Sequence, residues 1–217
     1  MHKKVVSNST AYHRVHENIL HEAMVNQPFW LPFAFYLPLG TFFLFKSFVI
    51  KRLSLFHLIW MLPLIVKFWG YLEYFLHKNI LHKNESIPID FGLIQEFHDL
   101  HHQYPNDDYK ISTPLWASVP SGILFYATCR TLLGESKGEA MFGLLVFYYL
   151  FYEFSHISAH KMQLKHPFFE GIKKHHLKHH YQDSDKAFGF TTDTWDIKSS
   201  SSFTQRSRKK PVESMDV

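Results

Sequence analysis

The chain has 217 residues, the length of one domain with tails, and a formal net charge of +4 with histidine counted as neutral. This mild charge, with no basic stripe interleaved with stacking aromatics outside the apolar segments, argues against a nucleic-acid-binding surface. The single cysteine, Cys129, excludes an intrachain disulfide and a cysteine-rich zinc module. The first 25 residues lack an apolar core, so we expect no cleavable signal peptide.

Polar and apolar segments alternate along the first third of the chain. Residues 1–27 are polar and are expected to be partly helical. An uncharged run then extends over 28–45 and, past Lys46, to Ile50, which is long enough to cross about 30 Å of hydrocarbon. A second apolar run covers 53–76. Because the link between the two runs is very short, we expect a helical hairpin.

A second hairpin is predicted further along the chain. A third apolar run covers 114–133, and a turn at 134–138 joins it to a fourth run at 140–154. The predicted fold is therefore all-α: an integral membrane protein with about four transmembrane helices in two hairpins and a cytosolic helical cap. We expect the membrane domain to span residues 28–197, followed by a disordered basic tail at 198–217.

The two hairpins would place residues 1–27, 77–113 and 156–217 on one side of the membrane. Lys and Arg are concentrated there, with eleven between Lys161 and Lys210, so the positive-inside rule assigns that side to the cytosol. Basic residues at 46, 51 and 52 lie on or near the opposite side and oppose this assignment. The alternative for the apolar runs is a buried helical core, which rarely needs an uncharged stretch of this length.

Histidine carries the chemical signal. Of seventeen histidines, ten form four boxes with the spacings Hx4H, HxxHH, HxxxH and HxxHH. Neutral imidazole is the commonest metal ligand in proteins, and it suits Zn, Cu, Fe and Ni. We therefore predict a histidine-rich dimetal site in the cap. The predicted ligands are His77, His82, His98, His101, His102, His156, His160, His176, His179 and His180.

Helical phase suggests how these ligands divide. At about 100° per residue, the first two histidines of each HxxHH box share a face, and the third points away from the second. The two histidines of the HxxxH box lie one turn apart. His77 and His82 differ by about 140° and should go to different ions, in an order that the spacing leaves open. One predicted group holds His98, His101, His176 and His179, and the other holds His102, His156, His160 and His180.

The remaining titratable residues receive no firm role from the sequence. His16 and His21 repeat the first spacing, but they stand alone in the polar N-terminal segment, so we interpret the pair as a coincidence. Metal-bound histidine usually donates its second N–H to a carboxylate or carbonyl. Carboxylates near the boxes are candidates for that role, with an ordinary surface or packing role as the alternative: Glu73, Glu96, Asp99, Glu153 and Asp183. The histidines predicted not to be ligands are His2, His13, His57, His166 and His175.

Several segments resemble the membrane fatty acid hydroxylase and sterol desaturase superfamily, and its fatty acid 2-hydroxylase branch in particular. Residues 97–107, FHDLHHQYPND, resemble the FHxxHHxxPxD signature of that branch. The Tyr152-Glu153 pair before the third box, KKHHLKHHY at 173–181 and FGFTT at 188–192 followed by Trp195-Asp196 resemble its other conserved segments. The resemblance covers roughly residues 30–197.

The resemblance implies a multi-pass enzyme of the endoplasmic reticulum membrane, with a dimetal site that faces the cytosol. It implies O2-dependent hydroxylation of carbon 2 of very-long-chain fatty acyl groups of ceramide, with electrons from NADPH through cytochrome b5 and its reductase. Zinc is the metal generally assigned in the family, but it has no redox chemistry, so we expect iron to be the metal that carries out the redox step. The implied ligand sets are His77, His98, His101, His176 and His179 for one metal and His82, His102, His156, His160 and His180 for the other.

Two departures and two alternatives accompany this interpretation. Residues 1–27 are too short for the cytochrome b5 domain that family members often carry, so we expect a separate electron donor. The segment after Ile197, a serine run and a basic tail, also differs from the family pattern. The alternatives are a sterol hydroxylase or desaturase on the same scaffold and a non-catalytic membrane protein that binds metal.

Overall fold

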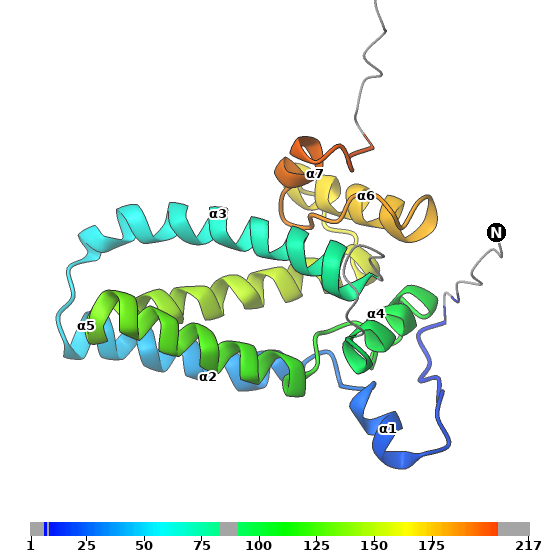
Figure 1. Ribbon diagram of the computed structural model, residues 1–217, viewed down its shortest axis with the longest axis horizontal. Coiled ribbons are helices and arrows are strands. Elements are labelled where there is room, and N and C mark those ends of the chain that lie inside the picture. The colour runs from blue at the N-terminus through cyan, green and yellow to red at the C-terminus, as the bar shows by residue number, and fades with distance from the viewer. Residues whose placement is uncertain (1–6, 8, 83–90, 204–217) are drawn as a thin grey trace, which may run out of the picture.

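The computed structural model describes residues 7, 9–82 and 91–203, and the ordered elements among them are helices, with no strand. The long helices lie side by side and form one end of the molecule, while the short helices gather at the other end (Figure 1). This arrangement confirms the predicted all-α fold with a helical cap. The long helices are α2 (Leu31–Phe45), α3 (Leu58–Leu76) and α5 (Leu115–Lys161).

The first predicted hairpin is confirmed. Helix α2 continues into the π-helical turn η1 (Lys46–Ile50), and the short 3-10 turn η2 (Leu55–His57) then leads into α3. Pro38 and Pro63 lie inside α2 and α3. Helices that cross a membrane tolerate such prolines because neighbouring groups satisfy the backbone groups that proline leaves unpaired.

The second hairpin is also confirmed, with a tighter turn than predicted. Helix α5 doubles back at Gly134, whose φ of +75° is readily accessible only to glycine. Its two arms lie antiparallel: the rings of Tyr126 and Phe142 are 5.3 Å apart, and Gly138 fits against the backbone of Cys129. The reversal is therefore made at Gly134, while residues 135–138 already belong to the second arm.

The second arm of α5 forms the centre of the membrane part. On one side its residues Met141 and Leu145 pack with Met61 and Ile65 of α3. On the other side its residues Phe142, Val146 and Leu150 pack with Tyr36 of α2. Close approach to α2 depends on small residues, because a Cβ atom added at Gly40 would lie only 2.9 Å from the Val146 side chain.

The outer faces of the long helices are apolar and exposed. Three helical segments are long and apolar enough to cross a membrane: 31–50, 55–81 and 115–161, the last of which is folded in two at Gly134. In the first two, only 17% of the most apolar window is buried inside the protein. Apolar surface on this scale indicates contact with lipid, because a helix in a soluble core would have most of this surface buried. The chain is a membrane protein.

A charged network closes the membrane part at the end away from the cap. Glu139 is fully buried and accepts hydrogen bonds from Lys46 Nζ at 2.7 Å and Arg130 Nη1 at 3.0 Å. Glu135 lies 2.5 Å from Lys51 Nζ. These pairs tie the end of the first hairpin to the turn of the second, and they account for Lys46 and Lys51 on this side.

The cap consists of α1 (Ile19–Met24), the π-helical turn η3 (His77–Leu81), α4 (Leu93–Gln103), α6 (Pro167–Tyr181) and α7 (Thr194–Lys198). The disordered tail was predicted to begin at residue 198, but the first residues of that range are ordered. Lys198 belongs to α7, and Ser201 is buried. The Ser201 hydroxyl donates to Asp196 at 2.7 Å, and the Ser201 carbonyl accepts from the Ala187 amide at 2.9 Å. The rest of the predicted tail, 204–217, and His2 lie outside the described residues.

Candidate metal centre

All ten predicted histidines converge where the cap meets the membrane helices. They form two groups, and within each group the ligand nitrogens all lie within 4.8 Å of one another. The first group is His77, His82, His98, His102 and His179. The second group is His101, His156, His160, His176 and His180. Helices α4 and α6 contribute to both groups, so they hold the two groups together.

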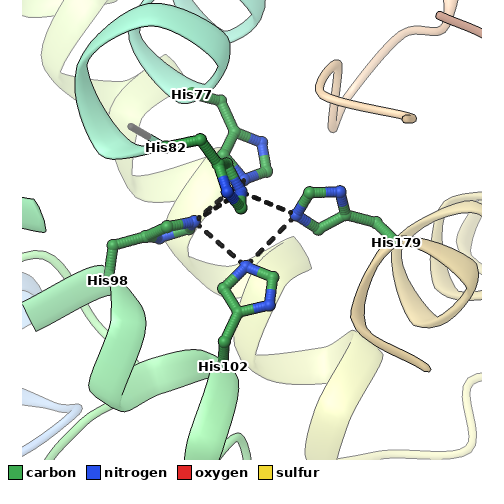
Figure 2. A group of neighbouring side chains, drawn as sticks. All are labelled: His77, His82, His98, His102 and His179. Atoms are coloured by element: carbon green, nitrogen blue, oxygen red, sulfur yellow. Dashed lines mark hydrogen bonds between the residues drawn. The ribbon is translucent and has the colours of Figure 1, made fainter. Parts of the chain in front are cut away.

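The first group surrounds a common point with its Nε2 atoms (Figure 2). The Nε2 atom of His98 lies 3.1 Å from those of both His82 and His102. The Nε2 atom of His179 closes the ring at 3.1 Å from His82 and 3.2 Å from His102. His77 lies above this ring, 3.1 Å from His98. A metal about 2.1 Å from ligands at right angles would separate neighbouring nitrogens by about 3.0 Å, which these distances match.

The second group has the same kind of geometry. The Nε2 atom of His180 lies 3.1 Å from that of His101 and 3.0 Å from that of His176, which in turn lies 2.8 Å from His160 Nε2. The two groups are in contact, because the ring of His102 stacks on the ring of His180 with centroids 4.2 Å apart. The arrangement can therefore hold two ions side by side.

Hydrogen bonds on the opposite ring nitrogens show which nitrogen faces the centre of each group. The Nδ1 atoms of His77 and His179 each lie 2.7 Å from a backbone carbonyl, and His101 Nδ1 lies 3.1 Å from another. A carbonyl only accepts, so each Nδ1 carries the proton and each Nε2 presents a lone pair. Lone pairs that converge without protons between them repel, and a cation at the centre removes that repulsion. The donor set fits a metal.

Burial keeps these imidazoles neutral, as metal ligands must be. Removal from water, reinforced by neighbouring imidazoles, holds the pKa of His98 and of His101 well below the usual range. For His179, burial is again the largest cause and brings the pKa to about 3. At neutral pH these side chains therefore stand ready to coordinate without first losing a proton.

The predicted division of the ligands between the two metals is wrong. His98 belongs with His102, and His101 belongs with the other group. On an α-helix, residues four apart differ by only about 40° in direction, which is less than the roughly 60° between residues three apart. The i and i+4 histidines therefore fall in one group on both α4 and α6, and the middle histidine of each box belongs to the other group.

His77 and His82 are also placed differently from the prediction, because both belong to the first group. The reason is local. Residues 77–81 form a π-helical turn in which the His82 amide donates to the His77 carbonyl at 3.0 Å. A π turn brings residues five apart close together, whereas the 140° separation assumed an α-helix.

A buried aspartate outside the histidine boxes orients the first group. Asp196 accepts hydrogen bonds from the Phe188 amide at 2.9 Å and the Gly189 amide at 2.7 Å. The loop it holds supplies the Phe188 carbonyl that fixes the His77 ring. The sequence had placed Asp196 within the family resemblance without indicating this role.

The second group is supported through another loop. His101 is fixed by the Lys110 carbonyl, and Lys110 is fully buried against Asp107, 3.2 Å away. Four of the five candidate carboxylates have partners other than the ten histidines. Glu73 accepts from the Thr191 amide and Glu153 accepts from the Thr113 amide, while Asp183 pairs with Lys186. Glu96 contacts His16 and His21.

An apolar cavity of about 430 Å³ connects the histidines with the membrane helices. His77, His98, His101, His156 and His176 line one part of it. The rest of its wall is formed mainly by apolar and aromatic side chains of α2, α3 and both arms of α5, including Tyr36, Trp69, Phe125, Phe142 and Leu145. The volume falls within the range of pockets for small ligands, and the lining suits a long apolar group.

Two membrane hairpins beneath a cap that gathers ten imidazoles define a class: a multi-histidine membrane protein with a candidate dimetal centre. Comparison with known proteins specifies the class further. Residues 62–199 match the sequence profile described as fatty acid hydroxylase, which is more than half of the chain. The protein belongs to the fatty acid hydroxylase family.

Curated relatives and a solved structure agree with this assignment. The chain is 31% identical over 132 residues to dihydroceramide fatty acyl 2-hydroxylase FAH1 of Arabidopsis thaliana, covering 59% of this chain and 54% of that protein. It is 33% identical over 131 residues to ceramide very long chain fatty acid hydroxylase SCS7 of Saccharomyces cerevisiae, covering 59% and 34%. A structure described as full-length scs7p, with only its hydroxylase domain visible, superposes with a TM-score of 0.74 at 26% identity, covering 87% and 71%. The chain thus spans about half the length of the first of these relatives.

Proposed function

We propose that this protein uses O2 to hydroxylate carbon 2 of very-long-chain fatty acyl groups of ceramide or other sphingolipids. One observation carries the proposal: histidines of both five-imidazole groups line the same cavity as the apolar side chains of the membrane helices. The names of the relatives, which describe acyl and ceramide hydroxylases, support the substrate class.

The cavity defines what the chain's own residues contribute. Aromatic and aliphatic side chains such as Trp69, Phe125 and Phe142 would hold the acyl chain and exclude water from it. Five of the ten histidines lie in the wall of that cavity, so a chain held there presents an unactivated C–H bond to the dimetal site. Orientation of a bound substrate at the reacting carbon is a large part of enzymatic rate enhancement.

We infer that the ten histidines are the ligands of two metal ions and that iron is the working metal. When bound, a redox-active metal pair supplies the oxygen activation that zinc, which has no redox chemistry, does not. We also infer that the electrons come from NADPH through a separate cytochrome b5 and its reductase. The excess of Lys and Arg on the cap side supports a site that faces the cytosol. We infer from the family resemblance that the membrane is that of the endoplasmic reticulum.

The proposal is tested in cells that lack their own 2-hydroxylase. Expression of the wild-type chain is expected to produce 2-hydroxy ceramides, measured by mass spectrometry, and His101→Ala is expected to reduce them to the empty-vector level. His101 is a suitable target because it is 2% exposed and central to the second group. His57→Ala is the matched control, because His57 lies outside both groups and the one hydrogen bond described for its side chain is accepted from Trp60.

The same lipid profile separates the alternatives. A change in sterols without 2-hydroxy ceramides would favour the sterol hydroxylase or desaturase. No lipid change from a well-expressed chain with metal bound would favour the non-catalytic metal-binding protein. Retention of hydroxylation by His101→Ala would show that the ligand assignment is wrong.

A further inference from the structure

A third cluster of ligand atoms lies outside the two histidine groups, at the surface of the cap. It combines His16 and His21 from the N-terminal segment with Glu96 of α4, which are far apart in the sequence. Glu96 Oε1 lies 2.7 Å from His16 Nε2, and Glu96 Oε2 lies 2.8 Å from His21 Nε2. The structure therefore brings His16 and His21 together with Glu96, although their spacing in the sequence had been interpreted as a coincidence.

The geometry of this cluster differs from an ordinary ion pair. The rings of His16 and His21 are stacked almost parallel, 7° apart in plane and 3.8 Å apart in centroid, and both Nε2 atoms contact the Glu96 carboxylate. His16 Nε2 is buried and lies near Glu96 without the alignment of a hydrogen bond. Two imidazole nitrogens and a carboxylate are thus directed at one region.

The chain holds these ligands in place before any ion arrives. Glu22 bonds to the His16 amide at 2.8 Å and to the Val15 amide at 3.1 Å, and it accepts from the Tyr12 hydroxyl at 2.6 Å. Burial by itself would raise the pKa of Glu22, but these hydrogen bonds outweigh it and lower the pKa to about 2. Asn18 caps the helix that carries His21. The ligand-bearing turn is therefore ordered by contacts of its own.

We propose that His16, His21 and Glu96 form a third metal site, which binds a zinc-class divalent ion and fastens the N-terminal segment to α4. Two histidines and one glutamate, with a further position open to solvent, are an established zinc donor set, whereas Mg²⁺ and Ca²⁺ prefer oxygen ligands. The side chains are 22%, 39% and 31% exposed, so an ion can exchange with solvent. Helix α4 also carries His98, His101 and His102, so the ion braces the helix that serves both histidine groups.

The test measures zinc in the full-length protein, purified in detergent, loaded with Zn²⁺ and freed of excess. His16→Ala and His21→Ala are each expected to lose one equivalent of zinc per chain relative to wild type. The double variant is expected to lose the same single equivalent, because both residues serve one ion. His57→Ala, remote from every cluster, is expected to lose none. Equal zinc in all of these proteins would overturn the proposal and leave a plain ion pair.

A second measurement guards against a variant that loses zinc through misfolding. Arg14 is exposed next to the site and offers a trypsin cleavage point. With free Zn²⁺ at 100 times the dissociation constant, cleavage of the wild-type chain is expected to slow by up to about 100-fold, and cleavage of His21→Ala to remain unchanged by Zn²⁺. Equal protection of both chains would also overturn the proposal. Failure of the dimetal assignment would instead change the zinc content that all variants share.

Discussion

Asp196 supports the first histidine group without belonging to it. It is fully buried and accepts three hydrogen bonds, from the amides of Phe188 and Gly189 and from the hydroxyl of Ser201. Gly189 is required at this point, since a Cβ atom there would lie 2.3 Å from the Thr192 carbonyl oxygen. One carboxylate thus organises the loop that orients His77.

Replacing this carboxylate is expected to weaken the first metal group without removing a ligand. In Asp196→Asn, the new NH2 group faces a backbone N–H, so two donors meet and one is left without an acceptor. A buried donor without an acceptor lowers the free energy of unfolding by about 1–3 kcal/mol. Loss of such an orienting contact typically lowers metal affinity 10- to 100-fold. Chelator competition and thermal unfolding in detergent measure the two effects. Asp193→Asn, at an exposed position nearby, is the control, and equal behaviour of the two variants would contradict the assigned role.

At the scale of elements, departures from the regular α-helix decide where side chains meet. The π turn at 77–81 places His77 and His82 in one group, and the reversal at Gly134 turns one long apolar segment into a hairpin. Close packing then depends on small residues at the contact between the two arms of α5. Gly138 is such a residue, since a Cβ atom there would lie 2.5 Å from the Cys129 carbonyl oxygen and 2.7 Å from Arg130 Cα.

Gly138→Ala is expected to destabilise the protein by about 1–3 kcal/mol, because the added methyl group meets backbone that cannot move aside by rotating a side chain. Gly171→Ala in α6 is the matched control. A Cβ atom at Gly171 meets nothing within 4 Å, and alanine is favoured over glycine in a helix by about 0.5–1 kcal/mol. Thermal unfolding in detergent should separate the two variants. A Gly138→Ala protein as stable as the control would show that the two arms of α5 can move apart without a loss of stability.

At the scale of the whole molecule, the cavity couples the cap to the membrane helices. Gly122, on the first arm of α5, lines it, and the atom nearest to a Cβ added there is the Tyr36 hydroxyl oxygen at 3.8 Å. A side chain introduced at this position would therefore project into space that the cavity occupies. Under the proposed function, this space holds the acyl chain.

Gly122→Leu is accordingly expected to shift the 2-hydroxy products several-fold toward shorter acyl chains while the metal content stays unchanged. Mass spectrometry of the ceramides measures the shift. The neighbouring Ile123→Leu is the control, because Ile123 is 64% exposed on the lipid-facing surface. An unaltered chain-length distribution with Gly122→Leu would place the acyl chain outside this cavity.

The sequence by itself determined which segments cross the membrane and which ten histidines gather. Both follow from local pattern, because a long apolar run is the signature of a membrane-spanning helix, and boxes at the ends of such runs meet when two hairpins stand side by side. The residues chosen for the site are the residues that the structure brings together, from His77 to His180.

Only the tertiary structure decided how the ten histidines divide into two groups, which residues orient them, and that a third cluster of ligand atoms lies on the same cap. The division depends on a π turn at 77–81, which the assumption of a regular α-helix misjudged, and on how α4 and α6 face each other. The roles of Asp196 and Lys110, and the meeting of His16 and His21 with Glu96, depend on contacts between residues far apart in the chain. Helical phase describes one element at a time, whereas a site of this kind is set by the packing of several.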